Sequence, residues 1–307
     1  MIDARLLRTL DLSALPGDKG VVHLSAASGL VRSGQRAFVV ADDELSLGVF
    51  DLAADQPGRL HRLFDGDLPS HHDERKAAKP DLEALALLPA FAGFPSGALL
   101  AIGSGSKPNR QRGALLALDA GGHLAGAVQA VDLAPLYQSL RAQFTELNIE
   151  GLFVTAGDVC LLQRGNRQSQ TNACIRFDWH QVACWLEGTG PAPIASSITA
   201  FALGALDGVP LGFTDGTALP GGGWAFCAAA EDSSDSYADG HCTGSAIGIV
   251  NAGGDLVQLE RLVHACKAEG ITGASDDDPL QLLLVTDADD RRAPAQLLAV
   301  TLPASAR

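Results

Sequence analysis

A similar pattern recurs five times along the chain and constrains the fold more than any other feature. Each copy has a small or acidic residue, then Gly or Ala, a short apolar segment, a turn, a second apolar segment and a polar loop. The copies start at Ser28, Glu83, Glu150, Asp215 and Glu269, at intervals of 54 to 67 residues. Repetition at a nearly even interval is typical of repeat architectures.

Each copy also contains short, almost wholly apolar segments of the kind found in sheets covered on both faces. The second segments of the five copies are 37–40, 99–102, 159–162, 224–229 and 282–285. The fifth copy lacks an outermost strand, which Arg5–Leu12 can supply. The sequence therefore predicts an all-β fold, a five-bladed β-propeller of four-stranded blades whose N-terminal strand closes the last blade. A β-sandwich, two smaller β domains, or a six-bladed propeller with an extra blade within residues 163–214 are the alternatives.

We expect one propeller domain over residues 1–307, with blades at approximately 21–66, 80–132, 148–204, 210–264 and 267–307 plus 5–12. Between the second and third blades, the segment after Asp132 carries an apolar stripe from Leu133 to Leu147, which predicts a helix. Three polar segments are interpreted as surface connections, namely His71–Glu74, residues 232–240 and residues 276–278.

Charge and apolar content narrow the functional class. The chain has 22 Lys and Arg against 36 Asp and Glu, and its net charge of −14 argues against a nucleic-acid or anionic-membrane partner. The uncharged stretch Ala84–Ser106 is interrupted by Pro89 and Pro95, so it predicts two buried strands and no membrane span. The first 16 residues lack the apolar region of a secretory signal, and the six cysteines lack metal-site spacing. We therefore expect a cytoplasmic protein with reduced thiols.

In a propeller blade, the innermost strand starts at the face to which the second strand returns. Polar residues at these positions should therefore meet at one mouth of the central channel. The carboxylates that would surround this mouth are Glu83, Glu150, Asp215 and Glu269. Candidate ligand-binding residues at the same mouth are Ser28, Asp42, Lys79, Ser104, Ser106, Arg110, Arg112, Asn166, Glu231, Lys267 and Asp287.

Four carboxylates around one axis repel each other unless a cation lies among them or their pKa values rise. Oxygen ligands suit Ca²⁺ or another divalent cation, so Glu83, Glu150, Asp215 and Glu269 form a candidate metal site. Alternatively, the nearby lysines and arginines neutralise the acids or bind a phosphorylated or carboxylate ligand. A third interpretation is that the acids only bond backbone amides of neighbouring blades.

Several phrases carry a family resemblance. They are SGL at 28–30, KPDLEAL at 79–85, IGSGS at 102–106, NIEGL at 148–152, RGN at 164–166, FTDGTAL at 213–219, AAAED at 228–232 and KAEGIT at 267–272. The chain resembles an uncharacterised bacterial propeller family allied to the "esterase-like activity of phytase" propellers and, more distantly, to the gluconolactonase/senescence-marker propellers. The lactonase likeness implies a divalent metal held at the mouth by Glu, Asn and Asp side chains. Glu83, Glu150, Asp215 and Glu269 occupy similar positions, but no clear Asn ligand accompanies them and Lys and Arg share the face.

These observations lead to two functional hypotheses. The first is a hydrolase of ester, lactone or phosphoester substrates, with Glu150, Glu269 and Arg164 as catalytic residues. A carboxylate or a metal-bound water would activate the nucleophile, and Arg164, Lys79 or Lys267 would stabilise the developing charge. The second is a non-catalytic propeller that binds a ligand or a protein partner. In either case we expect a small polar or anionic ligand at the mouth.

Overall fold

The structure is a computed structural model, and it describes residues 1–13, 22–166, 169, 171–232, 240–264, 266–273 and 281–302. The first blade contains β2 (Ala27–Ser33), β3 (Arg36–Ala41), β4 (Ser46–Asp51) and β5 (Arg59–Arg62). The second contains β6 (Leu82–Leu88), β7 (Ala98–Gly103), β8 (Arg112–Leu118) and β9 (Leu124–Asp132). The third contains β10 (Ile149–Val154), β11 (Asp158–Gln163), β12 (Asn172–Asp178) and β13 (Ser197–Phe201).

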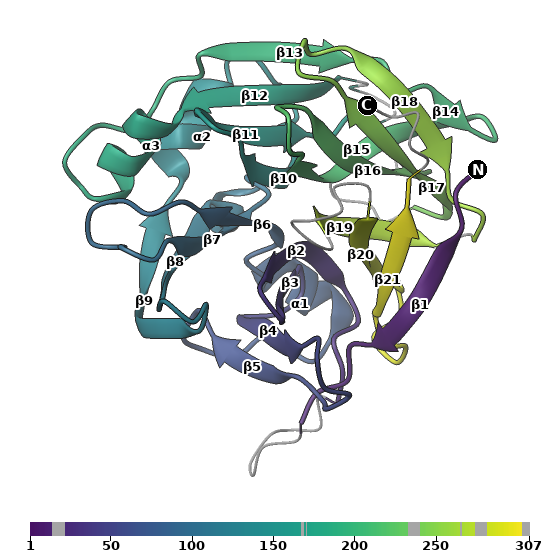
Figure 1. Ribbon diagram of the computed structural model, residues 1–307, viewed down its shortest axis with the longest axis horizontal. Helices are drawn as coiled ribbons and strands as arrows, with labels where there is room; N and C mark the ends of the chain where they lie inside the picture. Colours follow the sequence, from purple (N-terminus) through teal and green to yellow (C-terminus); the bar gives the residue numbers. More distant parts are fainter. Residues whose placement is uncertain are drawn as a thin grey trace.

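The fourth blade contains β15 (Val209–Ala218), β16 (Trp224–Glu231), β17 (Cys242–Val250) and β18 (Leu256–Arg261), and the short β14 (Ala205–Leu206) pairs with β15. The fifth contains β19 (Lys267–Gly273), β20 (Gln281–Asp287), β21 (Gln296–Thr301) and β1 (Ala4–Thr9). The five sheets surround a common centre, with β2, β6, β10, β15 and β19 innermost (Figure 1). The prediction of a five-bladed β-propeller is confirmed.

The predicted closure of the ring by the N-terminal strand is also confirmed. Strand β1 pairs antiparallel with β21, from Ala4 opposite Val300 to Thr9 opposite Gln296. The six-bladed alternative is wrong, because the additional length of residues 163–214 forms α3 (Trp179–Leu186) and β14. Helix α3 is not among the predicted elements. Its first turn is capped by the Asp178 side chain, which accepts a hydrogen bond from Gln181 N at 3.0 Å.

Two further helices connect blades. Helix α1 (His72–Ala78) occupies a segment predicted to be a solvated connection, and it places Lys79 and Asp81 just before β6. Helix α2 (Ala134–Leu140) is shorter than its apolar stripe, although the stripe is buried as far as Leu147. Residues 276–278 lie outside the described part of the chain. No helix among the described residues has the length and apolar character needed to cross a membrane.

Apolar side chains fill the spaces between neighbouring blades. Between the third and fourth blades, the ring of Trp224 stacks on Phe153 with 5.2 Å between centroids, and Phe213 and Phe226 pack edge to face at 4.8 Å. Trp224 is only 1% exposed. Large aromatic groups at this contact compensate for the small number of aromatic residues in the chain.

Every innermost strand has one irregular register, which lies close to the first residues in four blades and in the middle of β15 in the fourth blade. The shifts fall between Ala27 and Gly29, Leu82 and Ala84, Ile149 and Gly151, Phe213 and Asp215, and Ala268 and Gly270. Each shift is a β-bulge, in which one residue has no partner on the adjacent strand. The five extra residues are Ser28, Glu83, Glu150, Thr214 and Glu269.

The residues that follow the bulges pack against one another around the propeller axis. A Cβ atom built on Gly29 would lie 2.7 Å from the backbone nitrogen of Leu85, and one on Gly270 would lie 2.8 Å from that of Leu30. At Gly151 it would lie 3.0 Å from the Cα atom of Asp215. Glycine at these positions therefore permits a close approach of backbones that a larger residue would prevent.

Candidate functional site

The bulge residues place four of the five predicted mouth residues at equivalent positions, namely Ser28, Glu83, Glu150 and Glu269. The fifth prediction needs a correction. In the fourth blade the equivalent residue is Thr214, and Asp215 lies one residue further along β15, at the level of Gly151. Asp215 precedes Gly216 as Glu150 precedes Gly151, and this similarity displaces the predicted alignment of the fourth repeat by one residue.

Asp215 consequently lies in the packed centre of the propeller and not among the mouth carboxylates. Its side chain is fully buried, and its Oδ2 atom accepts a hydrogen bond from Ile271 N at 3.1 Å. Burial raises the pKa of Asp215 well above its usual range, although backbone N–H groups of Ile271, Leu152 and Leu30 counteract the rise. For Asp215, the structure therefore agrees with the interpretation that an acidic side chain bonds backbone amides of neighbouring blades.

Arg164 connects the third and fourth blades across the mouth. Its guanidinium lies 3.2 Å from Glu150 Oε2 and 2.8 Å from Glu231 Oε2. The stem of the arginine crosses the inner strand of the fourth blade at Gly212, where a Cβ would lie 2.7 Å from Arg164 Cγ. Burial alone would raise the pKa of Glu231, but Arg164 and Lys267 hold it at about 2. Arg164 and Glu150, two of the predicted catalytic residues, are thus brought together as an ion pair.

Lys267 forms a second basic centre, on the fifth blade. Its Nζ lies 3.3 Å from Glu269, 3.2 Å from Asp287, 3.2 Å from Asp289 and 3.6 Å from Glu231. Through Glu231 this cluster is continuous with Arg164. The structure therefore brings Glu269, the third predicted catalytic residue, into the same charged network.

Lys79 forms a third basic centre, between the first and second blades. Its ammonium contacts Asp42 and lies 3.0 Å from Asp81 Oδ1. Arg110 Nη1 approaches the other oxygen of Asp81 at 2.7 Å, and the Ser104 hydroxyl donates to that oxygen at 2.5 Å. Burial alone would lower the pKa of the Lys79 ammonium, but the charges of Asp42 and Asp81 raise it well above its usual range. Lys79 is therefore cationic at neutral pH.

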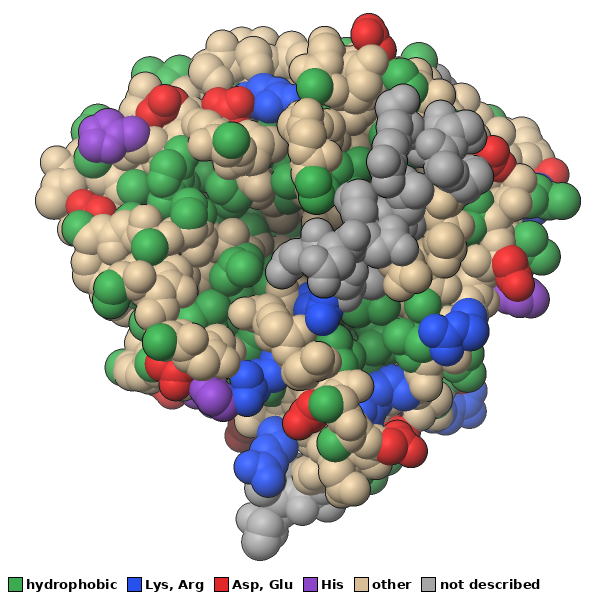
Figure 2. Space-filling model, in the orientation of Figure 1, with side chains coloured by type: hydrophobic (Ala, Val, Ile, Leu, Met, Phe, Trp, Pro, Cys, Tyr) green, Lys and Arg blue, Asp and Glu red, His purple; other side chains and the backbone are tan. Residues whose placement is uncertain are grey.

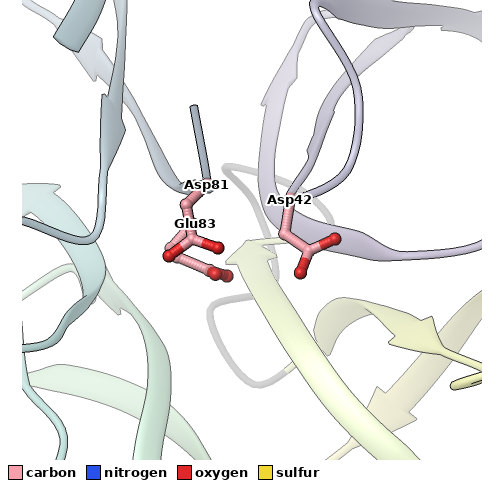
Figure 3. A group of neighbouring side chains, drawn as sticks. All are labelled: Asp42, Asp81 and Glu83. Atoms are coloured by element: carbon pink, nitrogen blue, oxygen red, sulfur yellow. The ribbon is translucent and has the colours of Figure 1, made fainter. Parts of the chain in front are cut away.

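Glu83 faces this group without a partner of its own. Figure 3 shows the carboxylates of Asp81 and Glu83 side by side, with Asp42 directed toward them from the end of β3. Within the described ranges, the Glu83 carboxylate has no hydrogen bond and no ion pair. Burial, followed by the charges of Glu150 and Asp81, raises the pKa of Glu83 well above its usual range. Glu83 thus faces the mouth with a raised pKa and without a hydrogen-bond or ion-pair partner among the described residues.

A cavity opens beside two of the basic centres, Lys79 and Lys267. Its volume is about 450 Å³, and Asp42 and Asp287 also contribute to its lining. Concave sites of a few hundred Å³ are suited to small molecules. A small ligand is therefore sterically compatible with this side of the charged mouth. Figure 2 draws the opposite face of the propeller, on the side of α3, where hydrophobic side chains border a hollow near the centre.

Other predicted ligand-binding residues have different surroundings. Ser106 supports Ser104 at 2.8 Å, and Ser28 Oγ donates to Ala26 O at 3.3 Å. Arg112 stacks over the ring of Phe64 at 4.3 Å, while Asn166 Nδ2 donates to Glu146 at 2.8 Å. None of these contacts reaches Arg164, Lys267 or Lys79. Ser106 also accepts a hydrogen bond at 3.0 Å from Arg110, which pairs with Asp81 in the cluster around Lys79. The predicted acidic loop 232–240 lies mostly outside the described residues.

Sequence reasoning missed two mouth residues. Asp81 was overlooked although it precedes β6 directly, and its φ of 57° is unusual for a residue other than glycine. Asn148 donates from its side chain to Glu150, two residues away, so an asparagine does accompany the mouth carboxylates. The available signal was the parallel spacing of Asp81 before Glu83, Asn148 before Glu150 and Lys267 before Glu269.

Three acidic side chains of the mouth lie close enough together to be considered as ligands of a divalent cation. Within the described residues, one group of three acids offers oxygens that all lie within 4.8 Å of one another, and it consists of Asp42, Asp81 and Glu83. Carboxylate oxygens at such separations can ligate Ca²⁺. However, Lys79 Nζ already contacts two of the three carboxylates. These three carboxyl groups therefore fit the Lys79 ammonium and do not fit an additional divalent cation.

Protonation of the mouth should make folding stability depend on pH. Burial raises the pKa of Glu269 to about 8, with Lys267 and Arg164 opposing the rise. An unfolded glutamate titrates near pH 4.3, so between about pH 4.5 and 8 the folded state binds the extra proton. This contribution to stability is complete below that window and is lost as the pH rises through 8. We expect the free energy of unfolding to fall between pH 6 and 8.

Urea denaturation at several pH values measures this slope. Glu269→Gln removes the titrating group and should flatten the decline, whereas Glu74→Gln on exposed α1 should leave it unchanged. An equally steep decline in the Glu269→Gln variant would show that Glu269 is not the group responsible.

Comparison with known proteins adds a family and a set of similar folds. A family model described as "family of unknown function (DUF6929)" matches residues 23–302. Among curated proteins, none matches the chain. The glutaminyl cyclase of Myxococcus xanthus is 11% identical, with a TM-score of 0.51, and the match covers 98% of each chain.

Two other solved structures are similar at lower scores. A luciferin-regenerating enzyme is 10% identical with a TM-score of 0.48, and the match covers 92% of this chain and 93% of that one. A gluconolactonase from Xanthomonas campestris is 13% identical with a TM-score of 0.43, and the match covers 90% of this chain and 72% of that one. Identities this low concern the fold alone, and the chemistry must be argued from the residues of the mouth.

Proposed function

This chain belongs to the DUF6929 family of unknown function, and from the geometry of its mouth we propose that it hydrolyses a small polar ester or lactone. The observation that carries the proposal is Glu83, a carboxyl group at the mouth whose pKa is raised and whose oxygens have no protein partner among the described residues. General acid–base catalysis needs such a group, because a carboxylate with a raised pKa is a stronger proton acceptor.

The neighbouring residues suit the remaining steps of ester hydrolysis. Glu83 in its ionised form accepts a proton from water as the water oxygen attacks the carbonyl carbon. Arg164 lies beside Glu150 and Lys267 beside Glu269, and these two cations stabilise the negative charge that develops on the carbonyl oxygen. Glu269, with its pKa raised to about 8, carries the proton that the leaving alkoxide receives. The products are a carboxylic acid and an alcohol, or a hydroxy acid from a lactone.

The ion pairs of the mouth favour an uncharged ester over a phosphoester. Each of the basic groups Lys79, Arg110, Arg164 and Lys267 already contacts at least one carboxylate. A phosphate would have to compete with these carboxylates for the same cations. The metal-assisted variant has less support, because Lys79 already contacts two carboxylates of the candidate metal group.

Binding without turnover is the second candidate, and one observation favours it. Arg164 and Lys267 are already engaged by two and four carboxylates respectively. Cations that are held so completely have less freedom to approach a reacting oxygen. In that case the cavity beside Asp42 and Asp287 would serve as a ligand-binding pocket.

A hydrolysis screen with the isosteric variant Glu83→Gln separates the candidates. We expect turnover of p-nitrophenyl esters or of γ- and δ-lactones, and a loss of about 100-fold or more in kcat/KM for Glu83→Gln. The variant should retain its melting temperature, since Glu83 makes no ion pair among the described residues. Glu74→Gln, on the exposed face of α1, is the matched control. Full activity of Glu83→Gln on a confirmed substrate would overturn the proposed mechanism, and ligand binding without turnover would favour the second candidate.

A further inference from the structure

The cluster of Asp42, Asp81 and Glu83 has the composition of a cation site, and the cation that it contacts is the ammonium group of Lys79. The oxygens of the three carboxylates lie within 4.8 Å of one another, and the Lys79 side chain is 10% exposed. Its Nζ contacts Asp42 and lies 3.0 Å from Asp81. We propose that the Lys79 ammonium replaces a divalent cation here, so that the cluster binds Ca²⁺ only when Lys79 is removed.

The surroundings hold the cluster in a form that suits a cation. Asp81 adopts a left-handed backbone conformation with φ 57°, which is unfavourable for a residue other than glycine. Its Oδ2 is fixed by Ser104 and Arg110, which leaves Oδ1 directed to Lys79. A carboxylate positioned in this way by other residues needs little rearrangement when its cation is exchanged.

The charge balance explains why Lys79 excludes a metal ion. An ammonium and a calcium ion attract the same oxygens, and they repel each other strongly at the distances within one cluster. Lys79 is tethered to the chain just before β6, so its local concentration exceeds that of any free ion. Without Lys79, three carboxyl groups would remain close together, with Arg110 beside Asp81, and a divalent cation would relieve their repulsion. This inference concerns Lys79 alone and is independent of the proposed hydrolysis.

Calorimetric titration of the purified protein with CaCl₂ tests the proposal. The wild-type protein should show no binding at this cluster up to about 10 mM, whereas Lys79→Met should bind one Ca²⁺ at least about tenfold more tightly than that limit. Its melting temperature should rise with added Ca²⁺ and fall again with chelator. Adding Asp42→Asn to Lys79→Met removes one ligand and should abolish the acquired binding. Lys107→Met removes an exposed lysine with the same change of charge and should acquire none.

Two results would overturn the proposal. One is Ca²⁺ binding by the wild-type protein that Asp42→Asn removes, because Lys79 would then coexist with the ion. The other is a folded Lys79→Met or Lys79→Gln variant that binds no Ca²⁺. Should both variants fail to fold, the ammonium resonances of Lys79 in isotope-labelled wild-type protein provide a separate readout. They should persist in 10 mM CaCl₂, and their displacement by Ca²⁺ would contradict the proposal.

Discussion

Replacing Asp215 with alanine is expected to lower the free energy of unfolding by about 3 kcal/mol. The carboxyl group is fully buried at the propeller axis, and it accepts a hydrogen bond from Ile271 N of the fifth blade at 3.1 Å. The N–H groups of Leu30 and Leu152 also act on it, from the first and third blades. Alanine would leave these donors facing a small cavity in the packed centre, where unpaired polar groups are costly.

Urea denaturation followed by far-ultraviolet circular dichroism measures the loss. Asp215→Asn keeps one acceptor oxygen in a side chain of nearly the same volume, so it should cost clearly less than Asp215→Ala. Asp55→Ala removes an exposed carboxylate and should change stability by no more than about 0.5 kcal/mol. If Asp215→Ala were as stable as the Asp55 variant, the axial carboxyl group would not join the blades.

Replacing Arg164 with methionine should cost about 3 kcal/mol at neutral pH. The guanidinium is 12% exposed and balances Glu150 and Glu231, each 8% exposed. Its removal leaves Glu150 without this ion pair and Glu231 with the more distant Lys267 at 3.6 Å. The pKa of Glu231, held at about 2 in the native protein largely by Arg164, should rise in the variant. A carboxyl group with a lowered native pKa stabilises the fold above its unfolded pKa, so the cost of the variant should shrink below about pH 4.

Arg176→Met provides the matched control for the loss of an arginine. Arg176 lies 3.2 Å from Asp158, but the two side chains are 29% and 34% exposed, so this change should cost less than about 1 kcal/mol. Arg164→Lys retains the charge but lacks the planar fork that reaches both glutamates, and it should recover only part of the lost stability. Equal stability of the two methionine variants would contradict the role assigned to Arg164.

The fold could be predicted because its repeats are visible in the amino-acid sequence. Apolar segments at regular intervals identify the strands, and the N-terminal segment matches the strand missing from the fifth blade. Helix α3 was missed because it interrupts a blade between β12 and β13, where repeat spacing carries no information about an insertion. The displaced alignment at Asp215 has a similar origin, since a bulge adds a residue without changing the apolar pattern.

The candidate site could be predicted only in outline. The positions of Glu83, Glu150 and Glu269 follow from the repeats, and the structure places all three on bulges at one mouth. Which acid pairs with which base depends on side-chain conformations across blade boundaries. Arg164, for example, reaches Glu231 of another blade by passing over Gly212. A pattern within one repeat cannot contain such a contact between repeats.

The five bulges remove one residue of each blade from the hydrogen-bonded ladders of the sheets. Ser28, Glu83, Glu150, Thr214 and Glu269 have no paired residue on the adjacent strand. Thr214 is fully buried and donates to Ala268 O at 2.8 Å, so in the fourth blade the same position joins two blades instead of facing a ligand. One backbone geometry thus carries a serine, a threonine and three glutamates, and substitution at Glu83 can vary the recognition properties of the mouth without a change in strand pairing.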